Sequence, residues 1–131
     1  MPRVAAVWGC TIQGVYYLFT GLWPLVSMET FQAVSGPKTD HLPTGNEADH
    51  WLVNTVGVLV IAIALPLLLS AWRARISPEV ILLAMAAAVG LLSIDVIYVA
   101  RSVILPIYLV DAALEAIFVL FWCLWLWLRK A

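Results

Sequence analysis

The segment that decides the fold is WLVNTVGVLVIAIALPLLLSAW, residues 51–72, which contains no charged side chain. A helix rises about 1.5 Å per residue, so a helix of this length spans the roughly 30 Å hydrocarbon core of a bilayer. Lipid offers no hydrogen-bond partner to backbone N–H and C=O groups, so a segment that crosses it forms a helix or part of a closed barrel. The segment therefore predicts a transmembrane helix over residues 51–72.

Three further segments have the same apolar character, at residues 4–26, 80–100 and 107–128, and a polar loop covers residues 27–50. Hydrophobic residues make up 64% of the 131-residue chain and charged residues 11%. Soluble domains are about half apolar and about a quarter charged. We therefore predict an all-α integral membrane protein with a single domain, residues 1–131, built as an antiparallel bundle of four transmembrane helices. The formal net charge of −1 leaves no basic surface for nucleic acid, so no nucleic-acid partner is expected.

The basic residues predict how this bundle is oriented. Five of the seven basic side chains fall on one side of the predicted bundle, namely Arg3, Arg73, Arg75, Arg129 and Lys130. By the positive-inside rule, that side faces the cytoplasm. We therefore expect a multi-pass protein of the cell membrane, with both termini in the cytoplasm, the loop 27–50 outside and the lipid bilayer as its surroundings. A homodimer is a further expectation, because four helices are few for a transporter acting alone.

Three carboxylates lie at membrane depth, where each costs about 2.5 kcal/mol or more at the centre of a helix. Asp111 and Glu115 are four residues apart and therefore share one face of the last helix. A short connection makes the last two helices antiparallel neighbours, so we expect Asp95 to approach Glu115 and Arg101 to approach Asp111. Two buried carboxylates close together do not both ionise easily, and one then holds a proton. We take Asp95, Asp111 and Glu115 as candidate residues for acid–base catalysis.

Polar and aromatic side chains gather in the same outer half of the predicted bundle. We take as candidate ligand-binding residues Gln13, Tyr17, His50, Asn54, Tyr98, Arg101, Tyr108 and Trp122. The alternative interpretation is structural. Polar side chains commonly hold transmembrane helices together, and arginine side chains near helix ends extend to the interface without further function.

The sequence lacks the motifs of several common binding sites and enzyme classes. The loop contains Asp40, His41, Glu47, Asp49 and His50, but their spacing matches no closed zinc site, so no metal is predicted. No P-loop, dinucleotide-binding glycine pattern or G-x-S-x-G motif is present, and no cofactor is predicted. The two cysteines, Cys10 and Cys123, form no C-x-x-C pair and are expected to pack as small apolar residues.

Four short helices with acids and aromatic residues around a pocket in the outer half resemble the layout of emopamil-binding and sigma-2-type proteins. The resemblance lies in architecture, with no shared motif, and it implies binding or isomerisation of a sterol-like molecule. The uncharacterised four-helix membrane proteins of bacteria are an equally good comparison. Architecture alone is a weak basis for assigning function.

Three functions from different classes remain open. The first is a protein that binds a lipophilic small molecule in this pocket and, as an enzyme, isomerises it by acid–base chemistry. The second is a subunit of an oligomeric proton-coupled transporter or channel, which requires a continuous polar path. The third is a non-catalytic accessory subunit that scaffolds a membrane complex, which requires the acids to be paired internally.

Overall fold

The computed structural model describes residues 2–27, 30–31, 50–102 and 106–130. Its long helices are α1 (Pro2–Val26), α3 (His50–Arg73), α4 (Pro78–Ala100) and α5 (Tyr108–Lys130), and the described residues form no strand. The predicted helices are present, with each end moved by a residue or two at most. Most of the predicted loop 27–50, including Asp40, His41, Glu47 and Asp49, lies outside the described residues, whereas His50 begins α3.

Three of these helices are long and apolar enough to cross a membrane, by length and composition. Their apolar spans are Leu52–Arg73, Pro78–Ala100 and Tyr108–Leu128. Helix α1 is also long, at 25 residues, but it does not belong to this group. Its polar side chains, among them Gln13, Tyr16 and Tyr17, lower its mean hydropathy. These three side chains form hydrogen bonds within the bundle.

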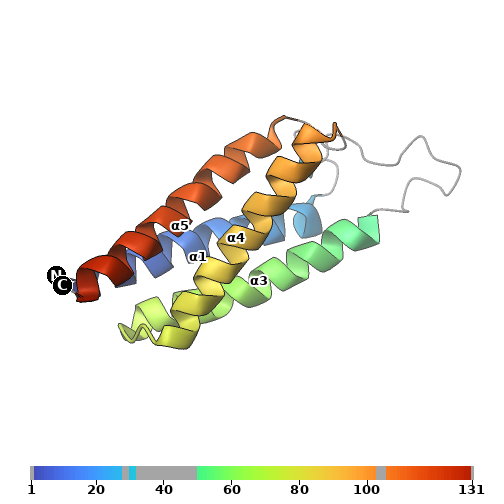
Figure 1. Cartoon of the computed structure of the whole chain (residues 1–131). Coiled ribbons are helices and arrows are strands. Elements are labelled where there is room, and N and C mark those ends of the chain that lie inside the picture. Colours follow the sequence, from blue (N-terminus) through green and yellow to red (C-terminus); the bar gives the residue numbers. More distant parts are fainter. Residues whose placement is uncertain (1, 28–29, 32–49, 103–105, 131) are drawn as a thin grey trace, which may run out of the picture.

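The helices form two closely packed pairs. Helix α1 packs mainly on α3, and α4 packs mainly on α5, while narrower contacts join α1 to α5 and α3 to α4. Figure 1 shows that both termini and the turn between α3 and α4 lie at one end of the bundle, which we call the terminal end. The start of α3 and the turn between α4 and α5 lie at the other end, which we call the loop end.

Two glycines allow backbone-to-backbone contact between α1 and α3. A Cβ atom on Gly21 of α1 would lie 2.5 Å from the carbonyl oxygen of Gly57 on α3, and a Cβ on Gly57 would lie 2.7 Å from the carbonyl oxygen of Gly21. The two backbones therefore touch each other directly. Small residues permit this kind of close helix packing in membranes, where the hydrophobic effect does not drive helices together.

Apolar side chains of every size, from alanine to tryptophan, fill the centre of the bundle, and other apolar side chains cover its outside. The buried apolar residues include Ala6, Cys10, Ala64, Leu67, Ile81, Ala84, Ala88 and Trp122. Many leucines, isoleucines and valines are instead exposed on the outer surface. Such an outward apolar surface suits lipid, since a water-soluble monomer rarely exposes large contiguous apolar areas.

The contact between Gly21 and Gly57 predicts that Gly21→Ala destabilises the protein by about 1–3 kcal/mol, because the added methyl group pushes two backbones apart. The matched control is Gly90→Ala on α4, where a Cβ atom would meet nothing within 4 Å. Alanine is the better helix former, so this variant should be unchanged or more stable by up to about 1 kcal/mol. Thermal unfolding in one detergent, followed by circular dichroism, measures both. Equal stabilities of the two variants would contradict the prediction.

Candidate functional site

Three carboxyl groups lie together in the half of the bundle nearest the loop end. Asp95 comes from α4 and is 6% exposed, Glu115 comes from α5 and is 0% exposed, and Asp111 of α5 is half-buried. The carboxyl group of Asp111 is within hydrogen-bonding reach of both others. We call these three residues the carboxyl cluster. Glu115 is about 10 Å from the start of α5 and Asp95 about 8 Å from the end of α4, at 1.5 Å per residue.

Two consecutive tyrosines of α1 hold the cluster from the opposite side. The Tyr17 hydroxyl donates a hydrogen bond of 2.6 Å to Oε1 of Glu115, and the Tyr16 hydroxyl donates a hydrogen bond to Oδ1 of Asp111. The ring of Phe118 packs against both tyrosine rings, with centroid distances of 5.8 and 6.1 Å. The cluster is therefore built by three helices, α1, α4 and α5.

A buried amide continues this network toward the centre of the bundle. The Gln13 side-chain nitrogen donates to the Tyr17 hydroxyl (3.1 Å) and to the backbone carbonyl of Ala84 (2.9 Å). Its side-chain oxygen accepts a hydrogen bond of 2.8 Å from the indole nitrogen of Trp122. Gln13 and Trp122 are 0% exposed and Tyr17 is 1% exposed. Each polar atom of the Gln13 side chain thus has a partner, as buried polar groups require.

The carboxyl cluster has no basic partner in the part of the chain that the structure describes. Arg101, at the C-cap of α4, is exposed and forms no ion pair with Asp111. Oδ2 of Asp95 and Oε2 of Glu115 are buried and accept no hydrogen bond from the described residues. An ionised carboxylate in such a place carries a large desolvation cost, so a hydrogen bond between two of these groups, with one of them protonated, is the arrangement that chemistry favours.

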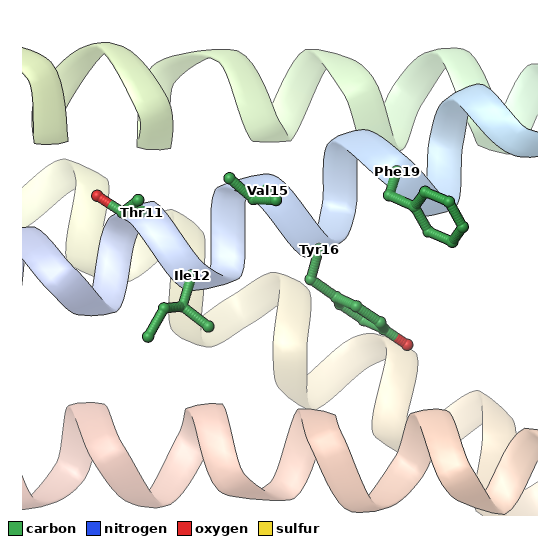
Figure 2. Close-up of a pocket in the computed structure, with 5 residues that line it drawn as sticks. All are labelled: Thr11, Ile12, Val15, Tyr16 and Phe19. Atoms are coloured by element: carbon green, nitrogen blue, oxygen red, sulfur yellow. The ribbon is translucent and has the colours of Figure 1, made fainter.

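An apolar groove runs along the outward face of α1 beside the cluster. It has a volume of about 460 Å³, is open to the side, and is lined by Thr11, Ile12, Val15, Tyr16 and Phe19. Figure 2 shows these side chains on one stretch of α1, with Tyr16 extending away from the helix toward α5. The Thr11 hydroxyl donates a hydrogen bond of 2.8 Å to the backbone carbonyl of Val7. Tyr16 therefore both lines the groove and touches the cluster.

The other predicted site residues lie on α3, on α4 and at the start of α5. Asn54 on α3 is half-buried, and its Oδ1 accepts no hydrogen bond from the described residues. Tyr98 on α4 and Tyr108 at the start of α5 are half-buried. His50 begins α3, but its side chain is outside the described part of the chain. No group of three or more potential metal ligands occurs within the described residues.

Asp95 was expected near Glu115, and it lies close to both acids of α5, since its depth is between theirs. The other expected pairing differs in the structure. Arg101 was expected near Asp111, but it caps the end of α4 and its side chain is exposed. The Tyr16 hydroxyl takes that position at Asp111 instead.

Sequence reasoning missed Tyr16 and the carbonyl of Ala84. Tyr16 and Tyr17 are adjacent, so they point about 100° apart on a helix, and they lie on either side of the direction of Gln13. Both hydroxyls nevertheless reach acids of α5. The pair of consecutive tyrosines was the available signal for Tyr16. A backbone carbonyl such as that of Ala84 leaves no signal in the sequence.

Comparison with known protein families, with curated proteins and with solved structures found no match to this chain.

The network predicts that Tyr17→Phe destabilises the protein by about 1–3 kcal/mol, because Glu115 loses a donor and Gln13 loses an acceptor in a buried place. Tyr98→Phe is the matched control, since the Tyr98 hydroxyl makes no hydrogen bond within the described residues. It should change stability by less than about 0.5 kcal/mol. Unfolding of both variants in the same detergent gives the two values. A Tyr17→Phe protein as stable as the wild type would show that this hydrogen bond does not form.

Proposed function

We propose that the protein binds a lipophilic small molecule at the carboxyl cluster and acts on it by acid–base chemistry. One observation carries the proposal. Asp95 and Glu115 are at least nine-tenths buried, each has a carboxyl oxygen without a donor, and no basic side chain of the described residues compensates them. Ionisable side chains inside a membrane are costly and rare, and those that no basic side chain neutralises commonly mark functional sites.

The groove on α1 supports the lipophilic character of the ligand. Its lining is almost entirely apolar, and the hydroxyl of Tyr16 connects it to Asp111. A molecule dissolved in the bilayer could approach the cluster from the side, with its apolar part against Ile12, Val15 and Phe19.

The chemistry that suits this site is the movement of a proton. General acid–base catalysis needs one group that gives a proton and another that takes one, both close to the substrate. Asp111 and Glu115 are adjacent, and each receives a hydrogen bond from a tyrosine. These hydrogen bonds stabilise the anion that remains when a carboxylic acid has given up its proton. Migration of a double bond needs no other reagent, since one C–H bond forms and a neighbouring one breaks.

We propose the following placement in the membrane. All four helices cross the cell membrane, the terminal end faces the cytoplasm, and the loop end faces outward. The close packing of α1 along α3 supports a fourth crossing, because α3 is among the most apolar segments. Arg73 ends α3 and Arg75 follows it at the terminal end, as the positive-inside rule requires of a cytoplasmic end.

The transporter hypothesis has less support. A proton path would have to continue from the cluster to the terminal end, but the buried residues in that direction include Ala6, Cys10, Leu67 and Ile81. The polar network extends inward as far as Gln13 and Trp122.

The proposal predicts a lipophilic molecule that copurifies with the wild-type protein and is lost in Glu115→Gln and in Asp111→Asn. Native mass spectrometry of the protein released from a mild detergent detects it. Both substitutions keep the shape of the side chain and remove its acid–base function. Glu79→Gln is the matched control, because Glu79 is exposed in the first turn of α4 at the terminal end. This variant should retain the adduct.

Two outcomes would contradict the proposal. One is the absence of any adduct from a folded wild-type protein. The other is an adduct of equal abundance in all four proteins. Either result, with all variants equally stable, would favour the scaffold hypothesis, in which the acids serve the fold.

A further inference from the structure

We propose that Glu115 is the proton donor of this site, that Asp111 is its proton acceptor, and that Gln13 sets this direction by orienting the hydroxyl of Tyr17. The inference rests on the proposed function and deepens it, since it assigns a role to each acid. In it, Gln13 and Tyr17 are positioning residues that act through Glu115.

The orientation of the Gln13 amide follows from two partners of fixed character. An indole N–H is only a donor, and a backbone carbonyl is only an acceptor. Trp122 therefore faces the amide oxygen of Gln13, and Ala84 faces the amide nitrogen. The side chain cannot be flipped without breaking both hydrogen bonds. The second N–H of the amide then points at the oxygen of Tyr17.

The orientation of the Tyr17 hydroxyl follows in turn. Its oxygen already accepts a hydrogen bond from Gln13, and a phenol has one proton to give. The partner left for that proton is Oε1 of Glu115, at 2.6 Å. Oε1 is thus an acceptor. In the neutral form of Glu115 the proton therefore resides on the other oxygen, Oε2.

A proton on Oε2 of Glu115 explains why this oxygen accepts no hydrogen bond from the described residues. A buried acceptor without a donor destabilises the fold, whereas an O–H group needs an acceptor and not a donor. Asp111 lies within hydrogen-bonding reach and offers an acceptor. The same reasoning applies to Asp95, whose Oδ2 has no donor and whose carboxyl group also reaches Asp111.

Asp111 is consequently the acceptor of the cluster. Its Oδ1 accepts a hydrogen bond from the Tyr16 hydroxyl. Asp111 is also less buried than Asp95 and Glu115, so a negative charge costs less there than on the other two acids.

The proton balance of a double-bond migration closes within this cluster. The O–H bond of Glu115 breaks as a C–H bond forms on the substrate, and a neighbouring C–H bond breaks as its proton passes to Asp111. The electron pair of that C–H bond forms the new double bond. Asp111 then returns the proton to Glu115, which is within hydrogen-bonding reach, and no water is needed.

Infrared spectroscopy of the full chain in phospholipid nanodiscs near neutral pH tests this assignment, because a neutral carboxylic acid has a C=O band that a carboxylate lacks. Glu115→Gln and Asp95→Asn should each remove one such band, and Asp111→Asn should remove none. Loss of a neutral-acid band in Asp111→Asn, or no loss in Glu115→Gln, would overturn the proposal.

The role of Gln13 has its own spectroscopic signature. Tyr17→Phe should raise the frequency of the Glu115 band, because its C=O group loses a hydrogen bond. Gln13→Met should broaden or split the band, since the Tyr17 hydroxyl can then either donate to Glu115 or accept from it. Tyr98→Phe should leave the band unchanged. A Glu115 band that Gln13→Met leaves unaltered would overturn the role of Gln13, and if this variant fails to fold, Tyr17→Phe still decides the direction of the hydrogen bond.

The two proposals fail in different ways. A copurifying molecule lost in Glu115→Gln, together with no neutral-acid band from Glu115, would leave the binding function and overturn the proton assignment. The expected bands without any bound molecule would leave the proton assignment and overturn the binding function.

Discussion

The rest of the structure depends on one constraint, which is that three carboxyl groups are enclosed among apolar helices without a basic partner in the described chain. Lipid cannot solvate them, so the protein itself must supply their hydrogen bonds. Helix α1 does so with Tyr16 and Tyr17, and Gln13 fixes the geometry of Tyr17. This demand explains why α1 is the least apolar of the four long helices. The most polar helix of the bundle is the one that faces the acids.

The same constraint explains how the two helix pairs are joined. Within each pair, α1 on α3 and α4 on α5, contact is extensive, and at Gly21 and Gly57 two backbones touch. Between α1 and α5 the packing is narrower, and hydrogen bonds from Tyr16, Tyr17 and Trp122 cross it. Polar bonds between helices are typically worth about 0.6–2 kcal/mol in membranes. The interface that carries the candidate site is thus held by directional bonds more than by area, and a bound molecule there would compete with few apolar contacts.

Hydropathy alone was enough to predict the helices to within a residue or two, because in these segments composition and length leave little choice. The all-helical fold and three apolar spans are confirmed, whereas the crossing by α1 and the orientation stay predictions. The site was harder. The spacing of Asp111 and Glu115 placed both on one face of a helix, but sequence periodicity does not fix how each helix is rotated or how far one slides along another. For that reason the expected pairing of Arg101 with Asp111 was wrong, and Tyr16 was overlooked beside Tyr17.

The structure shows the direction of the hydrogen bonds that lead to Glu115, which no sequence pattern indicates. A carboxylic acid with two similar oxygens has no preferred site for its proton until its surroundings distinguish them. Here the surroundings distinguish the two oxygens of Glu115. The Trp122 indole can only donate a hydrogen bond and the Ala84 carbonyl can only accept one, so together they fix the orientation of the Gln13 amide. The amide in turn fixes the direction of the Tyr17 hydroxyl, which leaves one oxygen of Glu115 for the proton. A site that gives and takes protons needs this asymmetry, and helix packing alone does not require it.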